Sequence, residues 1–195
     1  MRTHLLRWTE RGLYVCGAAL LALWLAWMLD ATAVQLWLAR RLDELRPGSS
    51  SGLVNSADAT RAEARRSGLV GRIEIPRLRV SAMIVEGTTG RALRRGVGHI
   101  EPTAFPGERG NVGLAGHRDT FFRQLRHLAP GDSIRIATPD GTFEYRVESL
   151  MIVDADRSDL LRATRAPVLT LVTCYPFDWV GSAPRRFVVR ARPLS

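Results

Sequence analysis

Short alternating patterns fill the chain from about residue 71 onward. Apolar and polar positions alternate there, or short apolar runs recur, between turns rich in Gly, Pro and Asp. A period of two is typical of β-strands that have one buried face. Many short strands with few helices predict a mainly β domain, and a closed β-barrel rather than a parallel α/β sheet. The strands are expected within residues 72–85, 111–116, 132–138, 141–153, 167–174 and 186–194.

Two short helical patterns interrupt these strands. The first covers residues 89–96, and the second covers residues 119–128. Apolar positions three and four residues apart lie on one face of a helix. The second segment has four such residues, namely Phe121, Phe122, Leu125 and Leu128.

The first part of the chain has a different pattern. Residues 12–29 contain no charged side chain, and roughly 20 apolar residues are needed to cross a bilayer. We therefore expect a transmembrane anchor over residues 12–38, with Trp37 near the membrane interface. A cleaved signal peptide and a buried core helix are the alternatives. The apolar run is longer than the core of a usual signal peptide, and no small-residue cleavage pattern follows it.

The charges before this segment predict its orientation. Before residue 12 the chain has three basic residues, Arg2, Arg7 and Arg11, and one acidic residue, Glu10. Positively charged flanks of a membrane segment stay on the cytoplasmic side. We expect a single-pass protein of the cell membrane, with residues 1–11 in the cytoplasm and the barrel domain on the extracytoplasmic side.

A linker is expected over residues 39–70, before the barrel domain of residues 71–195. From residue 44 this stretch is rich in Ser, Gly, Ala and Arg and shows no sustained apolar periodicity. Such a composition favours a solvated tether, although residues 56–66 could form a short helical turn.

The charge balance adds one rival function. The chain has 28 basic residues against 19 acidic ones, a net charge of +9, and all of the basic residues are Arg. A basic barrel could bind nucleic acid or an anionic surface. The arginines are spread along the chain without interleaved aromatics, and an extracytoplasmic domain does not meet nucleic acid, so an anionic envelope is the more plausible partner.

The candidate chemistry begins with an isolated cysteine. Cys174 ends the apolar run of residues 168–174, and the other cysteine of the chain, Cys16, lies inside the expected anchor. Cys174 therefore has no intramolecular disulfide partner. A free cysteine is often a small buried apolar residue, but a thiol at a strand end can also reach a cleft and act as a nucleophile if a base or cation lies nearby.

His117 is the best candidate for that base. It follows an apolar strand directly, after Gly116, whereas His127 falls in the expected helix and His99 has no distinguishing context. Asp119 could orient the imidazole, but the more ordinary interpretation is that it caps the helix expected to begin at Thr120.

Together these segments resemble the sortase family of cysteine transpeptidases. The resemblance lies in three segments, LAGHRD at 114–119, TLVTC at 170–174 and RFVVRA at 186–191. Sortases carry a TLxTC motif, an Arg at the start of the following strand, and a His after an apolar strand. The resemblance covers about residues 71–193, and the wording TCYPF is most similar to the class D group.

The resemblance implies a role for each matching residue. Cys174 would be the nucleophile, His117 the general acid and base, and Arg186 the donor to the oxyanion or to the substrate backbone. Arg185 competes for that last role, but neighbouring residues of a strand point to opposite faces, and the family pattern places the Arg before the apolar triplet. Thr173 resembles a substrate-binding threonine of the family, with packing as the equal alternative.

The resemblance also implies the partners. The substrates would be surface proteins with a threonine-containing C-terminal sorting signal, and the acceptor would be an amine of peptidoglycan or of another protein. A thiol hydrolase that passes the acyl group to water shares every one of these residues and stays open. We expect no metal and no other cofactor, because the sequence has no Cys/His cluster with metal spacing and no acidic cluster for the calcium that some sortases use.

Overall fold

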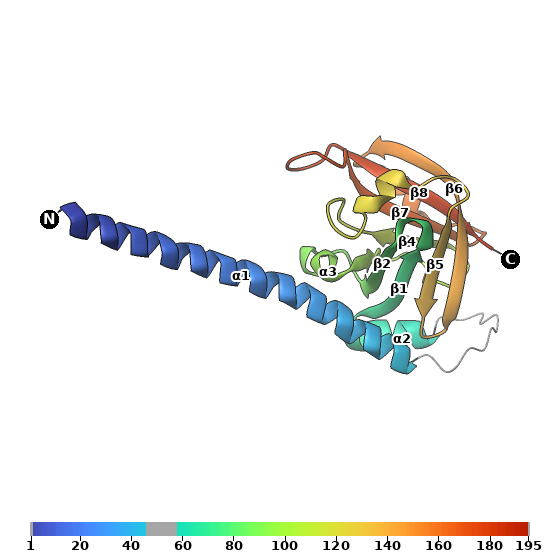
Figure 1. Ribbon diagram of the computed structural model, residues 1–195. Helices are drawn as coiled ribbons and strands as arrows, with labels where there is room; N and C mark the ends of the chain where they lie inside the picture. The colour runs from blue at the N-terminus through green and yellow to red at the C-terminus, as the bar shows by residue number, and fades with distance from the viewer. Residues whose placement is uncertain (1, 46–57, 195) are drawn as a thin grey trace.

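A computed structural model describes residues 2–45 and 58–194 of the chain. In this part of the chain, eight strands close into one barrel in the order β1-β2-β3-β4-β7-β8-β6-β5. Figure 1 shows the barrel at one end of a long helix. The mainly β, closed-barrel prediction is confirmed. The strands are β1 (Leu69–Ile75), β2 (Val80–Glu86), β3 (Val97–His99), β4 (Asn111–Ala115), β5 (Ser133–Thr138), β6 (Gly141–Asp154), β7 (Val168–Tyr175) and β8 (Arg185–Pro193).

Two parallel pairs set the topology. β4 runs parallel to β7, with Ala115 opposite Val172, and β2 runs parallel to β3. The other pairs around the barrel are antiparallel, including β7 with β8. Because β4 and β7 are parallel, their C-terminal ends meet at one rim of the barrel, and β8 begins at that same rim.

Alternation along β7 separates the barrel core from its outer face. Leu169 and Leu171 are fully buried in the main core cluster. Cys174 is only half-buried and is absent from that cluster. The thiol therefore belongs to the outward-facing set of β7, as the period of two predicts.

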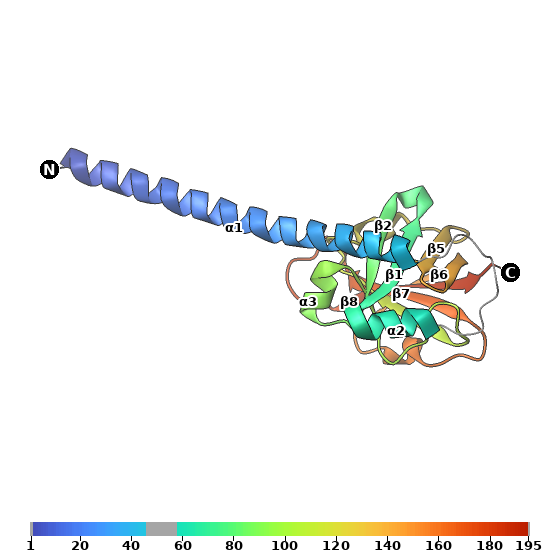
Figure 2. The same ribbon diagram turned by 90° about the horizontal axis from the view of Figure 1, so that it is seen from below.

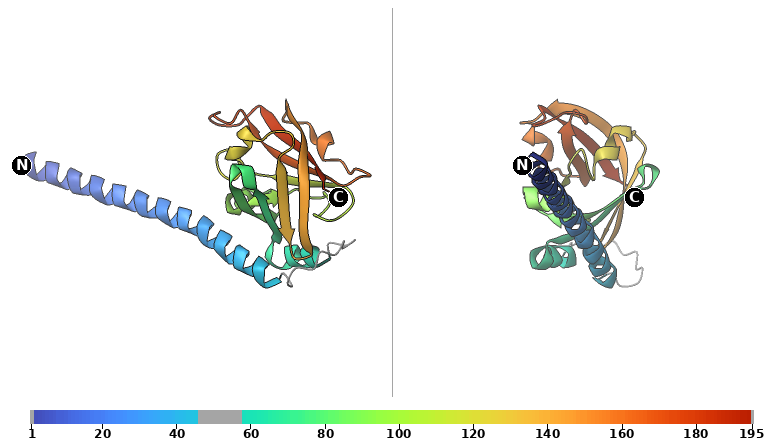
Figure 3. Two further views of the ribbon diagram at one scale, coloured as in Figure 1. Left: turned by 45° about the vertical axis from the view of Figure 1, so that its right-hand side comes forward. Right: turned by 60° about the vertical axis from the view of Figure 1, so that its left-hand side comes forward.

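The helix α1 (Arg2–Leu45) projects from the barrel over most of its length. Its last turns lie against β1, β2 and the short helix α3 (Gly90–Arg95), an arrangement visible in Figures 2 and 3. Leu38 and Leu42 are buried there with Leu69 and Met83 in a second core cluster. Gln35 completes the contact, since its side-chain oxygen accepts a hydrogen bond from the Met83 amide at 2.9 Å.

The expected transmembrane anchor over residues 12–38 is not supported. Among the helices formed by residues 2–45 and 58–194, none is both long enough and apolar enough to cross a bilayer. Asp30 interrupts the apolar run. The residues from Val34 onward pack against the barrel instead of continuing that run.

Residues of the expected linker also form regular structure where the chain is described. α1 continues to Leu45, α2 spans Asp58–Ser67, and β1 begins at Leu69; residues 46–57 lie outside the described part. α2 packs on the barrel because Asp140 of the β5–β6 turn accepts hydrogen bonds from the first amides of the helix, at 2.6 Å from Thr60. The side chain of Glu63 in α2 is 1% exposed and forms an ion pair with Arg41 of α1, with 3.3 Å between Arg41 Nε and Glu63 Oε1.

The helix expected over residues 119–128 is only partly present. Successive turns cover residues 118–122, and a 3₁₀ helix, η2, spans Arg123–His127. The backbone carbonyl of His117 accepts hydrogen bonds from the amides of Thr120 and Phe122. These bonds span three and five residues, whereas an α-helical bond spans four. Asp119 therefore does not cap a helix. Two further 3₁₀ turns are η1 (Pro76–Leu78) and η3 (Ser158–Leu161).

Candidate active site

The β7–β8 pairing places the cysteine beside an arginine. Cys174 lies directly opposite Arg186, and Tyr175 lies opposite Arg185. Directly opposed residues of an antiparallel pair have Cβ atoms about 4.5–5.5 Å apart on the same face. Arg186 therefore shares the outer face of Cys174, whereas the guanidinium of Arg185 lies over the ring of Tyr175, 5.4 Å from its centroid.

His117 reaches the same place from the neighbouring strand. It comes two residues after β4 ends, where the Gly116 amide donates a hydrogen bond to the Val172 carbonyl at 3.2 Å. A side chain on Gly116 would meet the ring of Phe122 at 2.7 Å. The glycine thus lets the chain turn over Phe122 and direct residue 117 away from the core.

Thr173 occupies the inner face and is 2% exposed. Its hydroxyl donates a hydrogen bond to the Gly116 carbonyl at 2.7 Å, and its side chain is not among those that line the cleft described below. This geometry is the packing alternative, and a substrate contact of Thr173 stays a prediction. The threonine instead ties the residue before the cysteine to the residue before the histidine.

One cleft of about 280 Å³ collects the candidate residues. Cys174, His117 and Arg186 all contribute to its lining, so the structure brings these three together. The sequence reasoning gave no role to four further lining residues, which are Arg118 and the loop residues Gly181, Ser182 and Ala183. Asp119 completes the lining as its single carboxylate.

Arg186 is held from one side only. Its Nη1 donates to the carbonyls of Ala183 and Arg185, each at 3.0 Å. Among residues 2–45 and 58–194, its Nε and Nη2 have no hydrogen-bond partner. Guanidinium donors are permanently charged and fixed in a plane, so the two free nitrogens remain available to an oxygen atom in the cleft.

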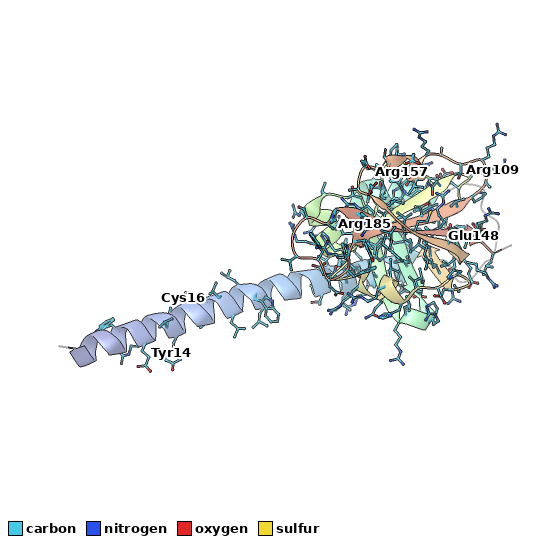
Figure 4. All side chains as sticks on the ribbon, turned by 90° about the horizontal axis from the view of Figure 1, so that it is seen from above. Tyr14, Cys16, Arg109, Glu148, Arg157 and Arg185 are labelled. Atoms are coloured by element: carbon cyan, nitrogen blue, oxygen red, sulfur yellow. The ribbon has the colours of Figure 1, made fainter. Side chains whose placement is uncertain are left out.

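The remaining cysteine and histidines lie elsewhere. Cys16 is exposed on the projecting part of α1, where Figure 4 labels it far from the barrel. His127 is exposed on η2. His99 is buried, and its Nδ1 lies 3.0 Å from the Glu86 carboxylate while its Nε2 lies 3.0 Å from the Ala104 carbonyl.

The arrangement suits nucleophilic acyl transfer. A thiol, an imidazole and a guanidinium with free donors line one open cleft, and these are the groups needed for attack on a carbonyl, proton transfer and stabilisation of an oxyanion. In the described part of the chain, no group of three or more His, Cys, Asp or Glu side chains is placed to hold a metal ion.

Comparisons with known proteins point to one family. A family model for the sortase domain matches residues 73–194. The Sortase D of Bacillus subtilis (strain 168) is 36% identical over 160 residues, which is 80% of this chain and 81% of that protein. A Sortase D5 transpeptidase of Clostridium perfringens superposes with a TM-score of 0.68 at 26% identity, covering 84% of this chain and 99% of the other. Sortase C1 of Streptococcus agalactiae gives a TM-score of 0.61 at 27% identity, covering 67% of this chain and 69% of the other.

Proposed function

Because this chain belongs to the sortase family of cysteine transpeptidases, we propose that it cleaves a threonine-containing C-terminal sorting signal and transfers the acyl group to an amine. The observation that carries this proposal is the convergence of Cys174, His117 and Arg186 on one cleft, with Cys174 and Arg186 as direct cross-strand partners.

The first half-reaction forms a thioester. The thiolate of Cys174, formed beside the protonated imidazole of His117, attacks the carbonyl carbon of the scissile peptide bond, and negative charge moves to the carbonyl oxygen. The free nitrogens of Arg186 would donate to that oxygen, because preorganised donors stabilise the charge that develops in the transition state. The C–N bond then breaks, and the protonated imidazole of His117 gives its proton to the departing amine.

The second half-reaction reverses these roles. The incoming amine attacks the thioester carbon, the neutral imidazole of His117 takes the proton from its nitrogen, and the C–S bond breaks to release Cys174. A water molecule in place of the amine would give hydrolysis. The same three residues serve both outcomes, and the acceptor decides between them.

Mass spectrometry of the full-length protein with sorting-signal peptides tests the reaction class. We expect an acyl adduct on Cys174 and release of the C-terminal fragment, with a new amide product when an amine is added. Cys174→Ala is expected to lose the adduct and all turnover while keeping the fold. Turnover by Cys174→Ala would contradict the nucleophile, and product that never contains the amine would identify a hydrolase.

Matched arginine variants test the oxyanion donor. Arg186→Lys keeps the charge but loses the planar fork, and loss of one oxyanion donor reduces kcat on the order of 10²–10³-fold. Arg185→Ala is the control on the same strand and should stay within a few-fold of the parent. Dispensable Arg186 with indispensable Arg185 would reverse the assignment.

We infer further that the projecting part of α1 attaches the protein to a membrane, with the barrel on the extracytoplasmic side. The support is a set of large apolar side chains that are exposed on this helix: Trp8, Leu13, Tyr14, Val15, Leu20, Leu21, Leu23, Trp24 and Leu25. We expect the protein in the membrane fraction after cell fractionation. Protease added outside intact cells should cleave the barrel domain. Recovery in the supernatant after washing with salt would oppose this attachment.

A further inference from the structure

The loop between β7 and β8, residues 176–184, forms one wall of the cleft, and hereafter we call it the β7–β8 loop. It joins the strand of Cys174 to the strand of Arg186 and supplies Gly181, Ser182 and Ala183 to the lining. From Asp178 to Pro184 none of its residues is buried, and Val180 is 95% exposed. Apolar burial therefore contributes little to holding this segment in place, and polar contacts must do so.

Arg118 makes the most direct of these contacts. Its Nη2 donates to the carbonyl of Trp179 at 2.6 Å and to the carbonyl of Gly181 at 2.9 Å. Gly181 has a φ of +87°, a left-handed conformation that glycine adopts without strain. One guanidinium nitrogen thus holds two carbonyls of the β7–β8 loop, one on either side of Val180.

Other contacts organise the rest of this loop around that point. The indole nitrogen of Trp179 donates to the Ser182 carbonyl at 3.1 Å. Arg186 donates to the next carbonyl, that of Ala183. A continuous set of contacts therefore runs from Arg118 through the loop to the guanidinium that faces Cys174.

Arg118 directly follows His117 in the chain, at the start of the turns that lead to η2. We propose that Arg118 is a positioning residue that fixes the β7–β8 loop as a wall of the substrate cleft and thereby controls substrate affinity. This role rests on the function proposed above. Arg118 itself does not touch the reacting atoms; it acts through the loop.

The proposal predicts a specific split between binding and turnover. If Arg118 is removed, the ordered wall is populated only part of the time, and the apparent affinity falls in proportion to that fraction. Hydrogen bonds to charged groups are stronger than neutral ones, so we expect KM for a sorting-signal peptide to rise about tenfold in Arg118→Ala. The kcat at saturation should change less than about twofold, because the bound complex contains the same ordered loop.

Two matched variants separate this role from others. Arg118→Lys keeps one nitrogen that can donate to two carbonyls, so it should restore most of the affinity. Arg123→Ala removes the same charge from the next turn of the chain. The Arg123 side chain is exposed, and within residues 2–45 and 58–194 it makes no hydrogen bond or ion pair with the β7–β8 loop. This control should match the parent protein in both kinetics and exchange.

Hydrogen exchange of the full-length protein, followed by mass spectrometry, tests the positioning without any substrate. Amides of residues 178–183 should exchange about tenfold faster in Arg118→Ala than in the parent or in Arg123→Ala, with the barrel strands unchanged. Unchanged exchange in this loop would overturn the proposal. So would a loss of kcat that Arg118→Lys cannot restore, because that result would indicate a direct catalytic contact. If no peptide is turned over, the proposed function fails, while the exchange result still decides whether Arg118 holds the loop.

Discussion

Docking of α1 onto the barrel should contribute measurably to the stability of the barrel itself. Leu42 is fully buried in α1, in a cluster with Leu69 of β1 and Met83 of β2. Truncation of a buried Leu to Ala costs about 2–5 kcal/mol, and less where the site can relax. Leu42 lies one turn from the end of a helix, so we expect Leu42→Ala to lower the free energy of unfolding by about 2–3 kcal/mol.

Chemical denaturation of the full-length protein in a mild detergent measures this loss, with circular dichroism as the probe. Hydrogen exchange in Leu69–Ile75 of β1 should accelerate in parallel, because β1 carries the other side of the contact. Leu36→Ala is the control: the same atoms are removed from the same helix, but Leu36 is 63% exposed, so the change should stay within about 0.5 kcal/mol. If Leu42→Ala unfolds at the same denaturant concentration as Leu36→Ala, then the docking of α1 does not stabilise the barrel.

Three further perturbations test individual contacts within the barrel domain. Thr173→Val removes the hydroxyl that binds the Gly116 carbonyl, and an unsatisfied buried acceptor costs about 1–3 kcal/mol; equal melting temperatures would show that the bond contributes nothing. Gly116→Ala places a methyl group against the Phe122 ring and should cost about 1–3 kcal/mol by overpacking, read by thermal denaturation, and a neutral result would mean that the ring moves freely. The hydrogen bond from Arg77 lowers the pKa of Asp132, against burial, which raises it, so this pair stabilises above about pH 4 and the gain is lost as the pH falls below the ordinary carboxyl value. Urea denaturation should therefore separate Arg77→Met from the parent more at pH 7 than near pH 2, where the hydrogen bond from Arg77 to the His127 carbonyl is the part that is still lost in the variant. A constant difference at both pH values would exclude this origin.

Much of the barrel follows from local patterns in the sequence. Alternation over residues 167–174 already assigns Leu169 and Leu171 to one face and Cys174 to the other, because a strand has only two faces. The same rule separates Arg185 from Arg186 once the family pattern fixes which of them precedes the apolar triplet. Both assignments agree with the register of β7 and β8.

Long-range docking was not predictable in the same way. The last turns of α1 pack on the barrel through Leu38, Leu42 and Gln35. From the sequence, Gln35 and Leu38 were expected in the anchor and Leu42 in the linker. Arg118 carried no local signal either, because it is one of 28 basic residues of the chain and its partners are backbone carbonyls some sixty residues away. Contacts to carbonyls depend on loop conformation, and side-chain patterns do not encode it.

The convergence at the cleft has a topological cause. β4 and β7 are parallel neighbours, so His117 and Cys174 both emerge where their strands end, although they are far apart in sequence. β8 is antiparallel to β7 and starts at the same rim, which places Arg186 opposite Cys174. A shift of one residue between β7 and β8 would turn Arg186 toward the core side and present Arg185 instead. The backbone pairing of β7 with β8 holds that register along both strands, from Leu169 opposite Ala191 to Tyr175 opposite Arg185.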